Sequence, residues 1–366
     1  EITMRQSKRQ TCLAVLGLCL LLSIAPGVAS AQEYRLENWV EGLDLPWGLA
    51  FLPGGGALVT ELGGALRHVD ESGETGPPLE HVPTVYFASQ GGLFDVVLHP
   101  RFTQNQWIYL SFAEGRPDDN GTAIARGRFI DGVIESMEVI FRSPTRKDTA
   151  VHYGGRMAFL PDGSLLLTTG EGFDDREAAQ DVGSSLGKVL RLNDDGSAAA
   201  GNPFPGSPYV FSYGHRNPQG LAVAADGTVW LHEHGPRGGD ELNRIVAGAN
   251  YGWPAVTHGL DYSGALISPF SELEGRVSPV HYWAPSIAPS GLAIYSGDLF
   301  PQWQGNLFVG ALVNREVRRL ELAAGGVLRE TPMFSELDAR VRDVRNGPEG
   351  ALYILLPDRI VRVLPP

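Results

Sequence analysis

The segment from residue 212 to residue 243 concentrates side chains that can bind ions. It reads SYGHRNPQGLAVAADGTVWLHEHGPRGGDELN and places His, Arg, Asn, Asp and Glu beside several turn glycines. Arginine and asparagine donate hydrogen bonds to anionic or carbonyl groups, whereas carboxylates and backbone carbonyls bind hard cations. We therefore expect this segment to form one wall of a ligand site.

The metal-binding groups of this segment allow two interpretations. His232 and His234 stand two residues apart, but no third zinc ligand follows at a suitable spacing, which favours histidines that only stabilise a strand. Pro236 has no amide hydrogen, so the carbonyls around Gly235 can face a hard cation, and carboxylates follow at 240–241. On spacing alone, a calcium site and an exposed acidic turn are equally compatible with the sequence.

Further polar residues stand close to the start of a repeated apolar strand. Each lies just before, or a few residues from, the glycine or aspartate that begins the strand. These residues are Gln90, His152, Arg216, Asn217, Arg340 and Arg342. A single Gln or His at such a position more often makes a structural hydrogen bond. Three guanidinium groups in equivalent places are unfavourable unless an anion lies between them. The set as a whole therefore predicts an anionic ligand.

The elements that must position these residues are short strands joined by tight turns. One pattern recurs six times: a glycine or aspartate, an apolar strand, a turn of Pro, Asp or Gly, and a second strand. The copies start at Gly48, Gly91, Gly154, Gly220, Gly291 and Asp343. Hairpins of this kind are typical of antiparallel meanders, and the spacing is typical of propeller blades. We expect an all-β, six-bladed β-propeller with antiparallel four-stranded blades, with a large sandwich or two β domains as the alternative.

The first 31 residues predict a secretory signal peptide. A basic lead precedes an apolar run over residues 12–24, and Ala29-Ser30-Ala31 fits cleavage after Ala31. Both cysteines of the chain lie in this leader, so the mature protein would have no disulfide. We expect a periplasmic or secreted protein with no membrane span after cleavage, in which residues 32–366 form a single catalytic propeller domain.

The charge of the chain disfavours polyanionic partners. The formal net charge is −13 at pH 7, and removal of the leader, with Arg5, Lys8 and Arg9 against Glu1, takes it to −15. Such a charge repels nucleic acid and anionic membrane surfaces. We therefore expect a small-molecule ligand and no nucleic acid.

The motifs together resemble those of the soluble glucose and aldose sugar dehydrogenases that depend on pyrroloquinoline quinone (PQQ), and most closely their broad-specificity aldose branch. The resemblance covers essentially all of the mature chain and rests on SYGHRNPQGLA, HEHGPRGGDELN, NYGWP, GKVLRLNDDG, FPQWQGNLFVGAL and RVRDVRNGPEG. It implies a six-bladed propeller with PQQ over the central channel beside a calcium ion. It also implies oxidation of the C1 hydroxyl of aldoses to lactones, with hydride transfer to PQQ and electrons passed to an external acceptor.

The resemblance implies roles for individual residues. His152 in VHYGGR matches the general base that takes the proton from the anomeric hydroxyl, and we expect Arg216 to contribute to catalysis as well. The residues expected to hold PQQ are Gln90, Arg216, Asn217, Arg340 and Arg342, with Trp283 as an aromatic near the cofactor face.

Two calcium sites are implied in the same way. Gly235 and Pro236 match the backbone carbonyl ligands of the calcium that polarises the quinone. Glu241 and Tyr251 match a second, structural calcium site. The cofactors expected are therefore PQQ and Ca²⁺.

Two positions depart from the family pattern. Val151 stands where glucose-specific members carry Asp, which points to a broader range of sugars. Val313 stands where members usually carry Lys, which bears on PQQ affinity, and Arg315 nearby could replace the carboxylate contact. A propeller that binds a glycan or protein without redox chemistry, and a calcium-dependent sugar lactonase, are the alternatives. The chain is expected to be a monomer or a dimer.

Overall fold

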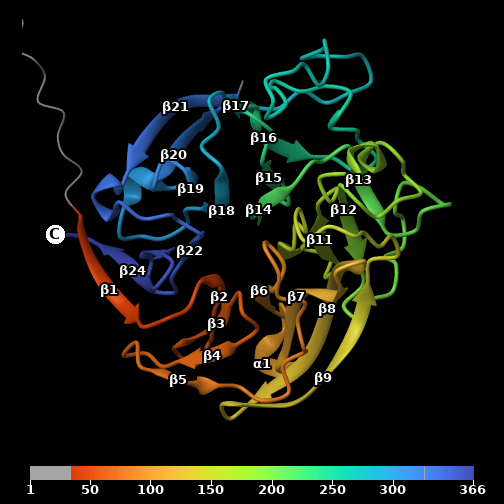
Figure 1. Cartoon of the computed structure of the whole chain (residues 1–366). Helices are drawn as coiled ribbons and strands as arrows, with labels where there is room; N and C mark the ends of the chain where they lie inside the picture. The colour runs from red at the N-terminus through yellow and green to blue at the C-terminus, as the bar shows by residue number, and fades with distance from the viewer. Residues whose placement is uncertain (1–33, 325) are drawn as a thin grey trace, which may run out of the picture. The chain divides into compact units, whose positions relative to one another are not determined.

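Six small sheets surround one axis in the computed structural model, which describes residues 34–324 and 326–366. Each sheet has four antiparallel strands, and the six sheets follow one another around the ring (Figure 1). This arrangement confirms the prediction of a six-bladed β-propeller. The predicted signal peptide lies outside the described residues.

Blades 1 to 5 each consist of four consecutive strands, starting with the strand nearest the axis. Blade 1 contains β2 (Pro46–Phe51), β3 (Ala57–Glu61), β4 (Leu66–Val69) and β5 (Thr75–Pro78). Blade 2 contains β6 (Leu93–Leu98), β7 (Trp107–Arg116), β8 (Asp119–Ile130) and β9 (Val133–Arg142). Blade 3 contains β10 (Met157–Phe159), β11 (Leu165–Thr169), β12 (Lys188–Leu192) and β13 (Val210–Tyr213).

The remaining blades continue this order. Blade 4 contains β14 (Pro218–Val223), β15 (Val229–Glu233), β16 (Asp240–Ile245) and β17 (His281–Trp283). Blade 5 contains β18 (Pro289–Ile294), β19 (Leu307–Ala311), β20 (Glu316–Ala323) and β21 (Gly326–Met333). Blade 6 contains β22 (Asp343–Asn346), β23 (Leu352–Leu355), β24 (Arg359–Leu364) and, on its outer edge, β1 (Arg35–Glu41).

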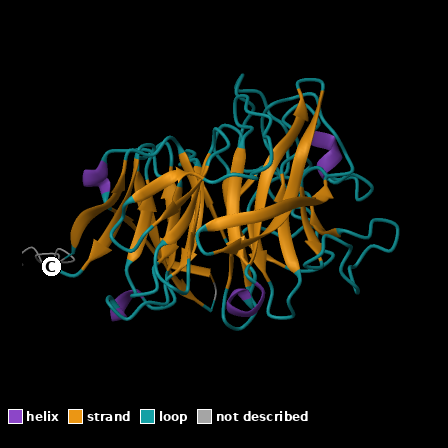
Figure 2. Ribbon diagram, turned by 90° about the horizontal axis from the view of Figure 1, so that it is seen from below, coloured by secondary structure: helices purple, strands orange, loops and turns teal. Residues whose placement is uncertain are grey.

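Helical segments are few and short in the described chain. They are α1 (Phe102–Asn105) and the 3-10 turns η1 (Arg176–Ala179), η2 (Pro301–Trp303) and η3 (Ser335–Leu337). Loops gather at both ends of the strands (Figure 2). None of the helices in the two described ranges is long and apolar enough to cross a membrane.

The ring is closed by strands from opposite ends of the described chain. The early strand β1 pairs with the last strand β24, from Arg35 opposite Leu364 to Glu41 opposite Arg359. In Figure 1 the red β1 therefore lies beside the blue β24. The last blade then has four strands like the others. β1 covers the edge of β24 that would otherwise be exposed where the ring closes.

The hairpin turns follow from the sequence signals that predicted them. Between β10 and β11, Asp162 accepts a hydrogen bond from the Ser164 backbone amide at 2.9 Å, and Gly163 has a φ of +85°. Asp caps such turns with its carboxylate, and glycine adopts the left-handed backbone without strain. The turn between β14 and β15 repeats this pattern with Asp226 and Gly227.

The hydrophobic core consists mainly of clusters between neighbouring blades. Leu58 and Leu66 of blade 1 pack with Leu93 and Leu110 of blade 2 in one such cluster. Because each apolar face is covered by the next blade, the ring itself holds the inner strands at the axis. The polar residues that precede these strands are consequently brought together at one end of the axis.

The axis is filled by charged side chains from three blades. Arg156, which precedes β10, lies 3.0 Å from the Asp343 carboxylate. Arg345 bridges Asp343 at 2.7 Å and Asp95 at 2.8 Å. Burial lowers the pKa of Arg156, and the two carboxylates oppose that shift. This network ties blades 2, 3 and 6 to one another beneath the site described below.

Asp343→Ala is expected to lower the free energy of unfolding by about 3–5 kcal/mol, because it removes the carboxylate that contacts both Arg156 and Arg345 and leaves them to share Asp95. Urea unfolding followed by tryptophan fluorescence would measure this loss. Asp358→Ala is the matched control, since the Asp358 side chain is 66% exposed beside Arg359. Equal midpoints for the two variants would contradict the role assigned to the network.

Candidate active site

A cavity of about 320 Å³ lies at the axis and receives side chains from all six blades. Its walls include the predicted residues Gln90, Asn217, Arg340 and Arg342. The other lining residues are Trp47, Leu62, Ser89, Phe94, Tyr153, Gly154, Gln219, His234, Ala288 and Leu312. The ring thus brings together residues separated by about 250 positions in the sequence, from Gln90 to Arg342.

Two arginines give this cavity positive charge. Arg342 donates a hydrogen bond to the Gln219 side chain at 3.3 Å. Burial, together with the charges of Arg156 and Arg340, lowers the pKa of Arg342 to about 10. Arg340 is exposed at the cavity wall. Neither arginine forms an ion pair with a carboxylate among the described residues, so a bound anion would offset their charge.

Arg216 lies beside the cavity and is almost completely buried. Its Nη1 donates to the carbonyl of Gly235 at 2.7 Å and to that of His234 at 3.2 Å. Its Nε has no hydrogen-bond partner among the described residues, and the nearest Glu171 oxygen is 3.9 Å away. A buried guanidinium with an unused donor can accept a further anionic or carbonyl oxygen.

His152 forms a buried pair with Glu171. Its Nδ1 lies 2.8 Å from Glu171 Oε2, and the pair is surrounded by protein. The carboxylate favours a proton on Nδ1, which leaves Nε2 as an acceptor without a hydrogen-bond partner in the described structure. Burial lowers the pKa of His152, and the Glu171 hydrogen bond opposes that shift. A neutral imidazole with a free Nε2 is suited to act as a base.

Glu171 was not among the residues predicted from the sequence. It lies between Gly170 and Gly172, two residues beyond the end of β11. A carboxylate placed between two glycines next to a strand end is the only local signal it carries. Gly170 is required at this point because a Cβ there would approach the His152 carbonyl oxygen to 2.2 Å.

The backbone around His152 is held in an uncommon conformation. Its φ of +53° lies in the left-handed region, which non-glycine residues rarely adopt. Gln90 Oε1 accepts the His152 amide at 2.9 Å, and Asn217 Oδ1 accepts the Gly154 amide at 3.3 Å. Lys147 donates to the Val151 carbonyl at 2.9 Å. Gln90 and Asn217 therefore position the base as well as lining the cavity.

The two residues predicted for the first calcium lie next to the arginine site. The Gly235 carbonyl faces Arg216, as described above, whereas the Pro236 carbonyl accepts no hydrogen bond in the described chain. Both residues line an outer cavity of about 570 Å³, which shares His234 and Ala288 with the central one. Carbonyl oxygens at this border suit a hard cation that shares its coordination with a bound anionic ligand.

Of the two residues predicted for the second calcium, Glu241 forms a buried pair of carboxylates with Glu233, and Tyr251 is buried as well. Burial and the charge of Glu233 raise the pKa of Glu241 well above its usual value. Asn243 donates to both carboxylates, and its own Oδ1 has no hydrogen-bond partner in the described part of the chain. Tyr251 stacks on His215, which in turn contacts Glu233 at 2.8 Å. The raised pKa and the unused oxygen fit a bound cation.

These carboxylates do not form a complete metal site by themselves. Within the described ranges, no group of three or more His, Cys, Asp or Glu side chains is arranged to hold a metal ion. Any cation at either place would therefore use backbone, amide or ligand oxygens as well.

Trp283 does not line the central cavity, contrary to the expectation that it faces the cofactor. It is 5% exposed and packs in the core with Trp230 and Leu242. Its Nε1 donates to Glu330 at 3.0 Å. The pairing of β17 with β16 places this ring between blades 4 and 5, so we leave it out of the cofactor site.

The histidines at 232 and 234 make structural hydrogen bonds, as expected. His232 Nε2 contacts the Ser290 carbonyl at 2.9 Å, and His234 Nε2 contacts the Pro289 carbonyl at 2.7 Å. Burial lowers the pKa of His232 to about 4. Both neutral rings connect blade 4 to blade 5.

The six-bladed propeller places an arginine-lined axial cavity beside a buried His–Glu pair, and comparison with known proteins identifies its family. The family model described as glucose / sorbosone dehydrogenase matches residues 43–363. The chain belongs to this family.

Three known proteins illustrate the relationship. Aldose sugar dehydrogenase YliI of Escherichia coli (strain K12) is 41% identical over 361 residues, covering 95% of each chain. Quinoprotein glucose dehydrogenase B of Acinetobacter calcoaceticus is 30% identical, covering 90% of this chain and 86% of that protein. The solved PQQ-bound aldose sugar dehydrogenase of Streptomyces coelicolor is 30% identical, with a TM-score of 0.76 over 91% of this chain and 99% of that one.

Proposed function

We propose that the protein oxidises the C1 hydroxyl of aldose sugars to lactones in a reaction that depends on PQQ and calcium. Electrons then pass to an external acceptor. The observation that carries this proposal is a set of arginines beside a buried His–Glu pair: Arg340 and Arg342 have no carboxylate partner among the described residues, and the Nε of Arg216 is an unused donor there. Similarity to aldose sugar dehydrogenases and to a PQQ-bound structure supports it. A lactonase would leave the three arginines unexplained.

The residues at the cavity fit PQQ by their chemistry. This cofactor carries three carboxylates and an ortho-quinone, which require guanidinium forks and amide donors. Arg216, Arg340 and Arg342 would supply the charge, and the side-chain amides of Gln90 and Asn217 would supply neutral contacts. When bound, PQQ would supply the redox chemistry by accepting the hydride from C1.

The protein residues would handle the proton. His152 would take the C1 hydroxyl proton at Nε2, and Glu171 would stabilise the resulting imidazolium through Nδ1. Burial keeps the pKa of His152 low, and the charge of Arg216 lowers it further, against the opposing effect of Glu171. Arg216 would thereby contribute to catalysis, because it favours the neutral imidazole before the sugar binds.

Glu171→Gln is expected to reduce kcat/KM by about tenfold or more, because the imidazolium loses its carboxylate partner. The rate of a base-catalysed step falls as the pH drops through the pKa of the base. Since Glu171 raises the pKa of His152, its removal should move this acidic limb to lower pH. A pH profile of kcat/KM for both proteins would measure the shift; an acidic limb at unchanged pH would contradict this role.

We propose that calcium binds at two places, one at the Gly235 and Pro236 carbonyls and one at Glu241. Gly235 and Pro236 would offer carbonyls to a cation next to the cofactor, where it would polarise the quinone. Glu241 would bind a second cation, with Glu233 and the unused Asn243 Oδ1 nearby and the Tyr251 backbone as a further ligand. This second cation would offset the like charges of the buried carboxylates.

Calcium is therefore expected to raise the melting temperature of the PQQ-free protein by several degrees, since it binds only the folded state. Glu241→Gln should remove most of this increase, because the variant lacks one of the buried charges. Thermal unfolding with Ca²⁺ and with a chelator would test both proteins. Glu349→Gln, in a loop of blade 6, is the control. An equal calcium effect in the Glu241 and Glu349 variants would contradict the second site.

Two departures from the family pattern bear on the substrate, at Val151, and on PQQ affinity, at Val313. Val151 cannot hydrogen-bond a sugar hydroxyl through its side chain, which agrees with a broad range of aldoses. Val313 is 58% exposed and lines the outer cavity. Arg315 pairs with Asp338 at 3.2 Å, so in this structure it does not replace the missing Lys.

Reconstitution tests the proposal directly. The purified protein would be loaded with PQQ and Ca²⁺, and sugar-dependent reduction of an artificial dye would be followed with hexoses, pentoses and disaccharides. We expect activity with several aldoses and none with C1-blocked methyl glycosides. Absence of activity with every sugar would overturn the proposed reaction.

The sequence of the leader supports a proposal for the cellular location. We propose a periplasmic or secreted enzyme, on the basis of the leader over residues 1–31. Its partners would be an aldose and an external electron acceptor, and it would act as a monomer or a dimer.

A further inference from the structure

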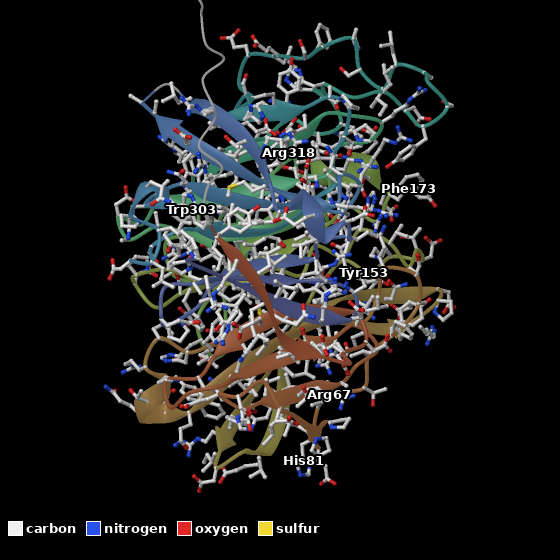
Figure 3. The ribbon with its side chains drawn as sticks, turned by 90° about the vertical axis from the view of Figure 1, so that its left-hand side faces the viewer. Arg67, His81, Tyr153, Phe173, Trp303 and Arg318 are labelled. Atoms are coloured by element: carbon white, nitrogen blue, oxygen red, sulfur yellow. The ribbon has the colours of Figure 1, made fainter. Side chains whose placement is uncertain are left out.

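Two aromatic rings form an exposed pair directly outside the base. Phe173 contacts the His152 ring with centroids 5.4 Å apart. It also stacks with Tyr262, with centroids 6.2 Å apart and an interplanar angle of 23°. Phe173 is 40% exposed and Tyr262 is 60% exposed. Figure 3 shows Phe173 toward the same face of the propeller as Tyr153 and away from Trp303.

The position of Phe173 is imposed by the catalytic pair. Its φ is +73°, in the left-handed region that large side chains rarely adopt. Its backbone amide donates to Glu171 Oε2, the same oxygen that contacts His152. Such a backbone persists where the surroundings determine it, and it is concentrated at functional sites. The Phe173 ring is thereby held next to His152, although its left-handed backbone conformation is unfavourable.

Tyr262 belongs to the long connection between β16 and β17 and is also held in place. Backbone hydrogen bonds in both directions join Leu260 to Arg237 next to the outer cavity. The Arg216 guanidinium lies 6.0 Å from the Tyr262 ring. Tyr262 is also a wall of the outer cavity of about 570 Å³. The Tyr262 ring thus lies between Phe173 and this outer cavity.

The surroundings of the pair suit a sugar ring. A pyranose has apolar C–H faces and a rim of hydroxyl groups, so it stacks on exposed aromatic rings while its rim reaches polar groups. Arg176 and Asp261 approach each other to 3.9 Å beside the aromatic pair, and each is more than one-third exposed. They supply a donor and an acceptor at the edge of the platform.

We propose that Phe173 and Tyr262 form an outer subsite that stacks on the second residue of a reducing disaccharide whose first residue lies at His152. This inference rests on the proposed function, because His152 marks where the reducing end would bind. It extends that function to aldoses carrying a further sugar residue on the reducing unit. The connection that carries Tyr262 would then contribute to substrate choice.

The experiment compares maltose with glucose, which present the same reducing-end residue, in the protein loaded with PQQ and Ca²⁺. In Tyr262→Ala, the ratio of kcat/KM for maltose to that for glucose should fall about tenfold, mainly through KM. Phe173→Ala should change the ratio in the same direction, and Tyr262→Trp should preserve it. Tyr282→Ala is the matched control, because Tyr282 is 47% exposed and stacks on His258 instead.

A binding measurement separates failure of the subsite from failure of the proposed reaction. Saturation-transfer NMR of maltose with the PQQ-free protein should show contact at the non-reducing ring, and this signal should weaken in Tyr262→Ala. An unchanged maltose-to-glucose ratio in both alanine variants would overturn the subsite. If no sugar is oxidised, the proposed reaction fails, and the NMR contact then decides the subsite: an equal signal in wild type and Tyr262→Ala overturns it.

Discussion

His152→Ala is expected to lower turnover with glucose by at least about 100-fold, because the C1 hydroxyl then lacks a base. The affinity for PQQ should stay within a few-fold of wild type, since the imidazole contacts Glu171 and Phe173 and does not line the central cavity. Dye reduction at saturating sugar would give kcat, and fluorescence titration with PQQ would give the affinity.

His81→Ala provides the control for this experiment. His81 is exposed in the outer part of blade 1, far from the axis (Figure 3), and the variant should match wild type in both measurements. A His152→Ala protein that loses PQQ affinity and turnover to the same degree would contradict the assignment of His152 as the base.

The double variant Arg340→Met/Arg342→Met is expected to weaken PQQ binding by about 100-fold or more. Each hydrogen bond to a charged group contributes about 1.5–3 kcal/mol, and tenfold in affinity corresponds to about 1.4 kcal/mol. The fold should tolerate the change, because neither arginine pairs with a carboxylate in the described structure and Met keeps most of the aliphatic volume. Removing the repulsion between these cations should offset part of any lost packing.

Arg315→Met is the control, since Arg315 carries the same charge but pairs with Asp338 at 3.2 Å and has a side chain that is 55% exposed. PQQ titration of the three proteins at one ionic strength would separate a local contact from a change in net charge. Equal affinity in the double variant and wild type would contradict the arginine site.

The fold could be predicted because its signals are local. Each blade begins with a glycine or aspartate before an apolar strand and turns on Pro, Asp and Gly, and six such copies determine a closed ring. The pairing of β1 with β24 carried no comparable signal, because it joins strands more than 300 residues apart. Only the closure of the ring brings them together.

Part of the candidate site could be predicted, because a residue that precedes the inner strand of a blade lies near the axis of the propeller. Gln90, Asn217, Arg340 and Arg342 precede inner strands, and all four line the cavity. Position alone did not reveal which atoms each side chain would contact. The hydrogen bond from the His152 backbone amide to Gln90 Oε1 is therefore known only from the structure.

Side chains on outer strands or in loops could not be placed in this way. Trp283 stands on an outer strand whose pairing turns its ring into the core. Glu171 follows His152 by 19 residues, beyond the β10–β11 hairpin, and its sequence signal is one carboxylate between two glycines. Phe173 and Tyr262 come from segments almost ninety residues apart.

A single-turnover measurement tests the proposed reaction most directly. The protein loaded with one equivalent of PQQ and with Ca²⁺ would be mixed anaerobically with glucose, without any electron acceptor, while the cofactor absorbance and the lactone are followed. We predict that the cofactor is fully reduced and that one equivalent of lactone forms, with the rate lowered at least about 100-fold in His152→Ala. Cofactor that binds tightly but stays oxidised with glucose and every other aldose would contradict the assignment of this propeller as a sugar dehydrogenase.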